Sequence, residues 1–112
     1  MRVLLALLLT GLGLLAQAPK GTLVIVGGGE MPPSVLQAFL KAAGGPGGTV
    51  GIIPTSTSYP DEALKEWKAD LEAAGLRFVA LDVRTRDQAS DPDLLARAQT
   101  CTGFWFSGGD QN

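Results

Sequence analysis

The sequence predicts an α/β fold with three layers, in which a parallel sheet carries helices on both faces and the chain stops after a fourth strand. Along its 112 residues, four short apolar runs alternate with three stretches of helical periodicity, and glycine and proline clusters separate them. Alternation of this kind is typical of parallel strands joined by crossover helices. The length allows one domain at most.

The four predicted strands are short, continuous apolar runs rich in β-branched or aromatic residues. Such runs are typical of strands that are buried on both sides of a parallel sheet. They span residues 23–26, 50–53, 78–81 and 103–106.

The three predicted helices are delimited by proline at the start and glycine or a polar residue at the end. The first begins at the Pro32-Pro33-Ser34 segment and ends before Gly44, and the second runs from residue 60 to residue 74. The third spans residues 91–100. Apolar residues recur at helical spacing in each, so each helix has one face that can cover the sheet.

The first 18 residues have the layout of a secretory signal peptide. Arg2 gives a positive start, residues 3–15 form an uncharged apolar stretch, and small residues follow at Ala16 and Ala18. The apolar stretch is shorter than the ~20 residues that a transmembrane helix needs. We therefore expect cleavage after Ala16 or Ala18, secretion of the domain that follows, from about residue 19 to residue 112, to the periplasm or medium, and no membrane association afterwards.

The composition argues against several classes of function. The net charge is -2 and the basic residues form no cluster, so we expect no nucleic-acid partner. The sequence has no histidine, which excludes a Ser–His or Cys–His pair and a histidine-ligated zinc site within these residues. We expect no metal and no cofactor. The single cysteine, Cys101, lies in an apolar stretch and is expected to be a buried side chain rather than a reactive thiol.

Three of the predicted strands are followed by loops of unusual composition, at residues 27–30, 54–59 and 107–112. Parallel strands end at the same edge of a sheet, and ligands bind beyond that edge. We therefore expect the three loops to form one site. Because the sequence stops directly after the third loop, we also expect the domain to continue beyond Asn112.

The residues of these loops indicate how the site would work. Gly108 and Gly109 expose backbone N–H groups that can stabilise an oxyanion, and Asp110 and Gln111 are placed to hold a polar substrate. The glycines after the first strand depart from the dinucleotide-binding fingerprint. Weaker candidates for the pocket wall are Gly28, Gly29, Glu30, Thr55 and Ser56.

Three segments together resemble the cyanophycinase branch of the serine peptidases. They are Gly-Thr-Leu-Val-Ile-Val-Gly-Gly-Gly-Glu at residues 21–30, Ile-Pro-Thr-Ser at residues 53–56, and Phe-Trp-Phe-Ser-Gly-Gly-Asp-Gln at residues 104–111. The resemblance spans about residues 20–112. It implies a fold similar to that of the class I glutamine amidotransferases.

The resemblance also implies a hydrolase that degrades cyanophycin, a poly-aspartate with arginine on its side chains, to β-Asp-Arg dipeptides. The nucleophilic serine of the family lies in a Gly-Thr-Ser-Ala-Gly type motif after the Gly-Gly-Asp-Gln loop, and a histidine follows later. Neither is present in this sequence, so the resemblance places the nucleophile and base downstream and no catalytic residue in this chain. It implies an oxyanion role for Gly108 and Gly109, and substrate contacts for Asp110 and Gln111.

Three other functions remain open at this point. One is a secreted binding module of the same fold without catalytic activity, and another is an aspartate-specific dipeptidase of the same family. The third is a nucleotide-binding α/β domain. The partner in the main interpretation is a peptide or an aspartate–arginine polymer, and a homodimer is also left open. We expect the 112-residue chain to be inactive by itself.

Overall fold

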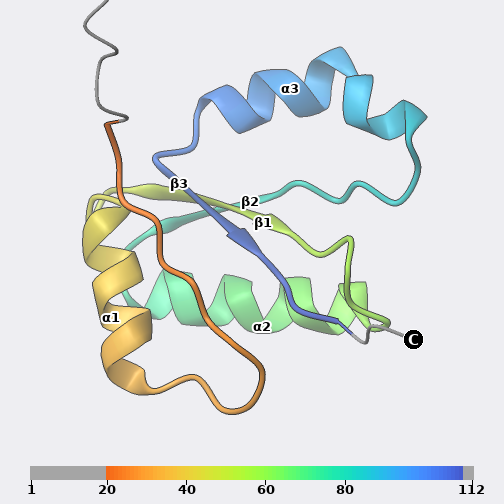
Figure 1. Ribbon diagram of the computed structural model, residues 1–112. Coiled ribbons are helices and arrows are strands. Elements are labelled where there is room, and N and C mark those ends of the chain that lie inside the picture. The colour runs from red at the N-terminus through yellow and green to blue at the C-terminus, as the bar shows by residue number, and fades with distance from the viewer. Residues whose placement is uncertain (1–19, 110–112) are drawn as a thin grey trace, which may run out of the picture.

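The computed structural model describes residues 20–109, which form a three-stranded parallel sheet with helices on both faces (Figure 1). In chain order the elements are α1 (Pro33–Ala42), β1 (Thr49–Ile53), α2 (Pro60–Ala73), β2 (Arg77–Ala80), the 3-10 helix η1 (Asp87–Ser90), α3 (Pro92–Gln99) and β3 (Gly103–Phe106).

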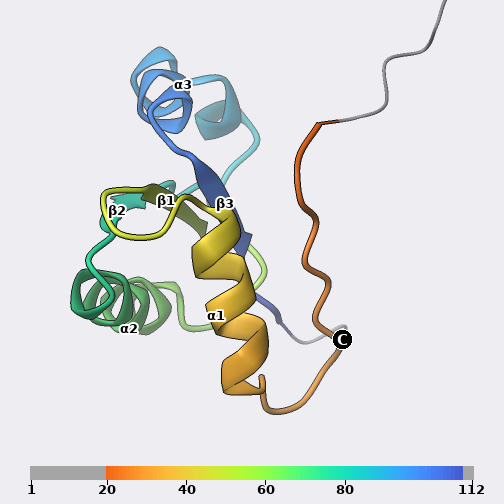
Figure 2. The ribbon, with the colours of Figure 1, turned by 90° about the vertical axis from the view of Figure 1, so that its left-hand side faces the viewer.

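The sheet has the order β2-β1-β3, and both neighbours of β1 run parallel to it. Val50 in the central strand is in register with Phe78 on one side and with Gly103 on the other. Figure 2 shows α1 and α2 on one face of the sheet and α3 on the opposite face. The predicted fold class is therefore confirmed, and the bounds of the three helices and of the last three predicted strands differ from the prediction by at most one residue.

The core lies between the sheet and the two helices α1 and α2. Val50 and Ile52 of β1 are completely buried there and pack with Phe39 of α1 and Leu71 of α2. Burial of such side chains contributes about 1.5–3 kcal/mol each. This face of the sheet is therefore the main source of stability in the described residues.

An aromatic cluster extends the core to β3. The rings of Trp67 and Trp105 have their centroids 4.7 Å apart, and Trp105 lies 5.1 Å from the ring of Phe39 in an edge-to-face arrangement. Offset and edge-to-face contacts are the favoured geometries for aromatic pairs. The cluster thus holds α1, α2 and β3 together at one side of the sheet.

The three α-helices begin in the same way, with proline at the first or second helical position. Proline suits this place because the first helical N–H has no partner within the helix. In α3 the side chain of Asp91 also accepts a hydrogen bond from the backbone N–H of Asp93, at 2.9 Å. These local signals explain why the helices start where the sequence predicts.

The prediction of a buried strand at residues 23–26 is wrong. This segment is extended but belongs to no strand, and Leu23 and Ile25 are both 83% exposed. It forms no ladder with β3, which is an edge strand of the sheet, and the cleft lined by residues of both segments lies between them. An apolar run becomes a buried strand only when neighbours hydrogen-bond to its backbone, and the described residues supply none here.

Two smaller findings complete the fold. The predicted polar loop at residues 82–90 contains the short helix η1. No helix within residues 20–109 is long and apolar enough to cross a membrane. The predicted signal peptide lies outside the described residues and stays a prediction.

Candidate functional site

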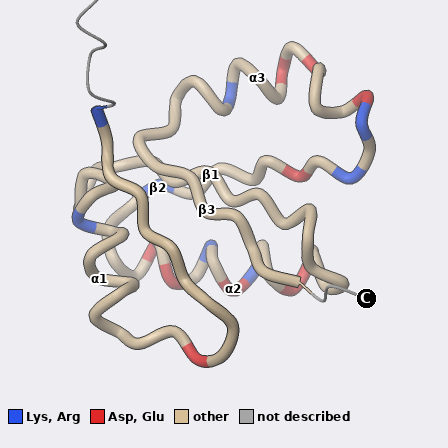
Figure 3. The backbone as a smooth tube through the Cα atoms, viewed as in Figure 1, with Lys and Arg blue, Asp and Glu red and all other residues tan. Residues whose placement is uncertain are grey.

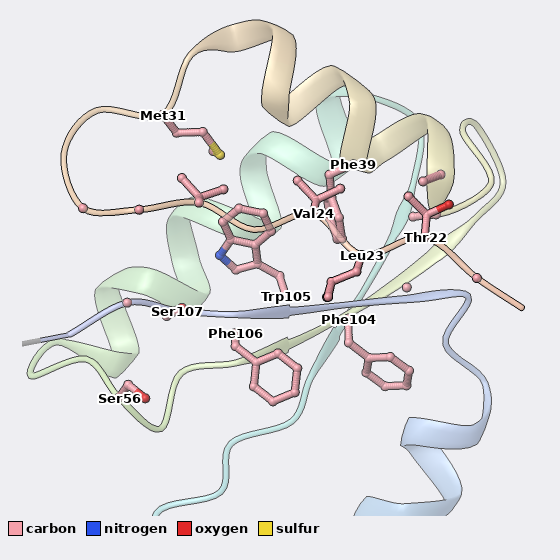
Figure 4. A pocket seen from close by; sticks show the side chains of 18 of the residues that line it. Thr22, Leu23, Val24, Met31, Phe39, Ser56, Phe104, Trp105, Phe106 and Ser107 are labelled. Carbon is pink, nitrogen blue, oxygen red and sulfur yellow. The ribbon is translucent and has the colours of Figure 1, made fainter. Parts of the chain in front are cut away.

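The candidate site is built at the carboxyl edge of the sheet, where β1 and β3 end side by side. Residues 54–59 follow β1 and residues 107–109 follow β3, so the sheet order places these two loops next to each other. A cleft of about 1260 Å³ opens from this edge along the outer side of β3 (Figure 4). Of the predicted site residues, the cleft is lined by Gly28, Gly29, Ser56, Gly108 and Gly109.

The two glycines after β3 have different surroundings. A side chain at Gly108 would meet no atom within 4 Å, whereas a side chain at Gly109 would collide with the backbone carbonyl of Ser56. Within residues 20–109, neither glycine amide has a hydrogen-bond acceptor. Gly108 is thus open towards the cleft, and Gly109 is required for the close approach of two loops.

The loop after β1 is fixed by hydrogen bonds of its own. The backbone N–H of Thr57 donates to the carbonyl of Pro54 at 3.1 Å, and the hydroxyl of Thr55 donates to the carbonyl of Val83 at 2.6 Å. The hydroxyl of Thr55 therefore ties this loop to the chain that follows β2. Ser56 lines the cleft, and Thr55 is not among the lining residues.

The glycine-rich segment forms the opposite wall of the cleft. Gly28 and Gly29 line it, and Gly29 has a positive φ of 101°, a backbone conformation that favours glycine. Glu30 is exposed and is not among the lining residues. The structure thus brings Gly28 and Gly29 to the same cleft as Gly108, although the segment is not part of the sheet.

The predicted residues Asp110 and Gln111 lie outside the described residues, and their contacts with a substrate stay a prediction. Within residues 20–109, no group of three or more histidine, cysteine, aspartate or glutamate side chains is placed to hold a metal ion.

The sequence analysis missed an ion-pair network at the same edge of the sheet. The guanidinium of Arg84 binds Asp82, with Nε 2.8 Å from Oδ1, and also Asp61 at the start of α2, with Nη2 2.7 Å from Oδ1. Hydrogen bonds to Asp82 first, and then to Asp61, raise the pKa of Arg84 above its usual value. The sequence did contain a signal for this network, namely the oppositely charged Asp82 and Arg84 directly after β2. The sequence analysis interpreted this loop only as polar.

The sequence analysis also did not single out Ser107. Its backbone N–H donates to the carbonyl of Ile53 at 3.0 Å, which continues the ladder between β1 and β3. Its hydroxyl oxygen is buried and has no hydrogen-bond partner among the described residues. A buried hydroxyl without a partner costs about 1–3 kcal/mol, so this oxygen marks a place where a polar partner is lacking.

Cys101 precedes β3 and is partly buried, with its thiol 3.6 Å from the carbonyl oxygen of Arg97. Burial raises the pKa of the Cys101 thiol above its usual value. A raised pKa lowers the fraction of reactive thiolate at neutral pH. Cys101 is therefore less readily ionised than a free thiol, and it is partly buried rather than buried as predicted.

Comparison with known proteins finds similarity to cyanophycinases. A cyanophycinase of Synechococcus elongatus is 34% identical over 96 residues, which cover 82% of this chain. The chain is a relative of the cyanophycinases. Cyanophycinases of Geminocystis herdmanii and of Trichormus variabilis are each 29% identical, over 96 and 99 residues respectively. No protein-family model matches the chain.

The similarity to the cyanophycinases covers most of this chain and only a part of each relative. The chain spans 30% of the Synechococcus protein, 35% of the Geminocystis protein and 33% of the Trichormus protein. About two thirds of each cyanophycinase therefore has no counterpart in these 112 residues. The resemblance that the sequence motifs indicate is confirmed, and the roles of single residues at the site stay predictions.

Proposed function

We propose that this chain is the N-terminal part of a longer, secreted serine-type hydrolase that cleaves an aspartate–arginine polymer of the cyanophycin type to β-Asp-Arg dipeptides. The observation that carries the proposal is the similarity to cyanophycinases over 82% of the chain. It is supported by the open Gly108 backbone at the carboxyl edge of the sheet. Ligands of open parallel sheets bind beyond this edge.

In this proposal the chain supplies the half of the site that stabilises charge and holds substrate. The N–H groups of Gly108 and Gly109 have no hydrogen-bond acceptor within residues 20–109, and in this proposal they donate to the oxyanion that develops in the reaction. Asp110 and Gln111 contact the polymer. The loop at residues 54–59, fixed by Thr55, forms the neighbouring wall.

The nucleophile and its base are supplied by the polypeptide beyond Asn112. The 112 residues contain no histidine, and relatives are about three times as long as the matched segment. A serine needs an adjacent base to attack a peptide carbonyl at neutral pH. We therefore expect no dipeptide release by the 112-residue chain alone.

The direct test is to read the coding sequence beyond Asn112, express the longer protein and assay dipeptide release from cyanophycin. We expect turnover by the longer protein and none after replacement of the downstream serine by alanine. Binding of the polymer without any turnover would instead favour a binding module of the same fold. Turnover restricted to short peptides with N-terminal aspartate would favour a dipeptidase.

Secretion is a separate part of the proposal, and it rests on the layout of residues 1–18. N-terminal sequencing of the protein recovered from the medium or periplasm tests it. We expect the mature chain to begin at Gln17 or Pro19. A protein that starts at Met1 and stays inside the cell would contradict it.

A further inference from the structure

The loop after β1, residues 54–59, lies between the loops that follow β2 and β3, because β1 is the central strand of the sheet. Two consecutive residues of this loop contact the two sides. The hydroxyl of Thr55 donates to the carbonyl of Val83 in the loop after β2, at 2.6 Å. The carbonyl of Ser56 lies against Gly109 in the loop after β3. The loop after β1 therefore connects the other two.

The contact on the side of β3 is steric. A side chain at Gly109 would collide with the carbonyl of Ser56, so the two backbones already lie as close together as they can. A shift of Ser56 towards the chain end would displace Gly109, and a shift in the other direction would remove the contact that supports it. The position of Ser56 therefore helps to fix where the backbone of Gly109 lies.

The contact on the side of β2 is a single hydrogen bond. Among the described residues, the other hydrogen bonds of the loop after β1 stay within the loop or lead into α2, as in the bond from the N–H of Thr57 to the carbonyl of Pro54. Those bonds shape the loop, and they do not place it relative to the neighbouring strands. The hydroxyl of Thr55 is thus the polar group that anchors the loop to the side of β2.

The acceptor of this hydrogen bond is itself held in place. Val83 lies between Asp82 and Arg84, and Nε of Arg84 is 2.8 Å from Oδ1 of Asp82. The backbone N–H of Arg84 also donates to the side-chain oxygen of Gln88, at 2.7 Å. Figure 3 shows charged residues along this part of the chain and along α2, and none along β3. The charged residues therefore help to hold the loop after β2, and they do not line the cleft.

We propose that Thr55 is a positioning residue for the reaction, and that its hydroxyl acts through Ser56 to hold the Gly109 N–H where the oxyanion develops. This rests on the proposed function, in which that N–H stabilises the charge. Thr55 is not among the residues that line the cleft, so it acts without touching the substrate.

The size of the effect follows from the strength of one hydrogen bond. Such a bond changes an equilibrium by a factor of about two to ten, so loss of the Thr55 bond increases the population of the displaced loop by no more than this factor. The charge on the oxyanion develops only in the transition state. We therefore expect kcat to fall by about two- to tenfold and KM to stay nearly unchanged.

The NMR amide signal of Gly109 in the longer protein tests the position of the turn without any assay of activity. Thr55→Val keeps the shape of the side chain and removes the hydroxyl, whereas Thr55→Ser keeps the hydroxyl. The bond is exposed, so water can replace the hydroxyl at the Val83 carbonyl and Thr55→Val should fold. We expect the Gly109 signal to move in Thr55→Val and to stay close to its parent position in Thr55→Ser.

Three results of this measurement would overturn the proposal. The first is an unmoved Gly109 signal in Thr55→Val. The second is equal movement in Thr55→Val and Thr55→Ser, which would assign the effect to the methyl group. The third is a loss of folding in Thr55→Val, which would mean that the hydroxyl holds the whole fold rather than one loop.

Thr85→Val is the matched control for loss of a threonine hydroxyl at the same edge of the sheet. The hydroxyl oxygen of Thr85 accepts a hydrogen bond from the N–H of Gln88 at 3.4 Å, so its bond stays within the loop after β2. This variant should leave the Gly109 signal in place. Movement as large as in Thr55→Val would show that any change in that loop reaches Gly109, which contradicts a specific role for the Thr55 hydroxyl.

Dipeptide release by the longer protein connects the position of the turn with the reaction. Besides the loss of kcat in Thr55→Val, most of which Thr55→Ser should restore, we expect Thr55→Val to cost little in a protein that already carries Gly109→Ala. Both changes act on the same contact, so their effects should not add. Fully additive losses would mean that Thr55 acts by another route and would overturn the proposal.

The two measurements also separate this proposal from the proposed function. If the longer protein releases no dipeptide, the proposed function fails, and movement of the Gly109 signal in Thr55→Val would still show that Thr55 positions the turn. A parent-like kcat in Thr55→Val would overturn the positioning role and leave the proposed function in place.

Discussion

The two sides of the sheet's central strand differ in how completely they are built. On the side of β2 and α2, β1 has a paired neighbour and a buried core in which Ile52 and Leu71 have no exposed surface. On the side of β3, the next segment along the sheet is unpaired, and Ile25 and Phe106 are largely exposed. The core extends to β3 through Trp105, and the exposed apolar residues lie on the side of β3, where the candidate site also lies.

The largest effect that this comparison predicts is a contrast between two isoleucines. Ile52→Ala removes a completely buried side chain and should lower the free energy of unfolding by about 2–5 kcal/mol. Ile25→Ala, at a site that is 83% exposed, should change it by no more than about 0.5 kcal/mol. Urea denaturation of the two variants of the 112-residue chain measures both. Similar losses for the two variants would show that residues 23–26 are packed in solution.

A second contrast concerns the two glycines after β3. Gly109→Ala forces the loop of Ser56 away from the chain end, because the new side chain would collide with the Ser56 carbonyl. A shift of about 1 Å near reacting groups can lower kcat/KM by about 100-fold. Gly108→Ala meets no neighbouring atom and leaves the loop of Ser56 in place, but its methyl group stands at the open approach to the N–H, so we expect a smaller loss of kcat/KM than in Gly109→Ala. Dipeptide release by the longer protein measures both.

The NMR amide shift of Ser56 gives a control for the glycine contrast that does not depend on activity. It should move in Gly109→Ala and stay in place in Gly108→Ala. If Ser56 is undisturbed in both variants, the close approach of the two loops does not exist in solution.

Much of the fold could be predicted from sequence because local signals define it. Proline at Pro33, Pro60 and Pro92 begins the three helices, and buried apolar runs give β1, β2 and β3. Residues 23–26 have the same apolar character, yet they form no strand. Strand formation depends on a hydrogen-bonding neighbour as well as on the run itself, and an apolar run carries no information about its neighbour.

Two parts of the candidate site were predicted because their residues follow strands, whereas Gly28 and Gly29 line the cleft although the strand expected before them is absent. Gly108 and Ser56 were found because β1 and β3 both end at the same edge. The contact between Gly109 and Ser56, and the network of Asp61 with Arg84, join residues far apart in the sequence. Such pairings arise from tertiary packing, and no local pattern in the sequence specifies them.

The hydrogen bonds of Thr102, which join the start of β3 to β1 and to the end of α1, give a third prediction, with an effect of intermediate size. The side-chain oxygen of Thr102 accepts a hydrogen bond from the buried backbone N–H of Thr49 at 2.9 Å, and its hydroxyl donates to the carbonyl of Ala43. Thr102→Val leaves the Thr49 N–H without a partner and should cost about 1–3 kcal/mol in urea denaturation.

Thr102→Ser is the matched control, because it keeps the hydroxyl and removes only a methyl group. It should retain most of the stability that Thr102→Val loses. Equal losses in the two variants would assign the effect to the methyl group and would contradict the role of the hydrogen bond in joining β1 to β3.

The smallest expected effect is at the ion-pair network of Arg84, which lies on the complete side of the sheet but at its exposed edge. Arg84 and Asp61 are 46% and 79% exposed at their side chains, so solvent and salt screen their attraction. Arg84→Met should lower the unfolding midpoint by no more than about 3 °C at low salt. The difference should vanish at about 1 M salt, where the screening length is only about 3 Å.

Arg86→Met is the matched control, since Arg86 makes no ion pair within residues 20–109 and carries the same charge. Its midpoint should equal that of the parent chain at both salt concentrations. A large loss in Arg84→Met that persists at high salt would show that the network is buried in solution. In that case the carboxyl edge beside β2 would be less exposed than the structure shows.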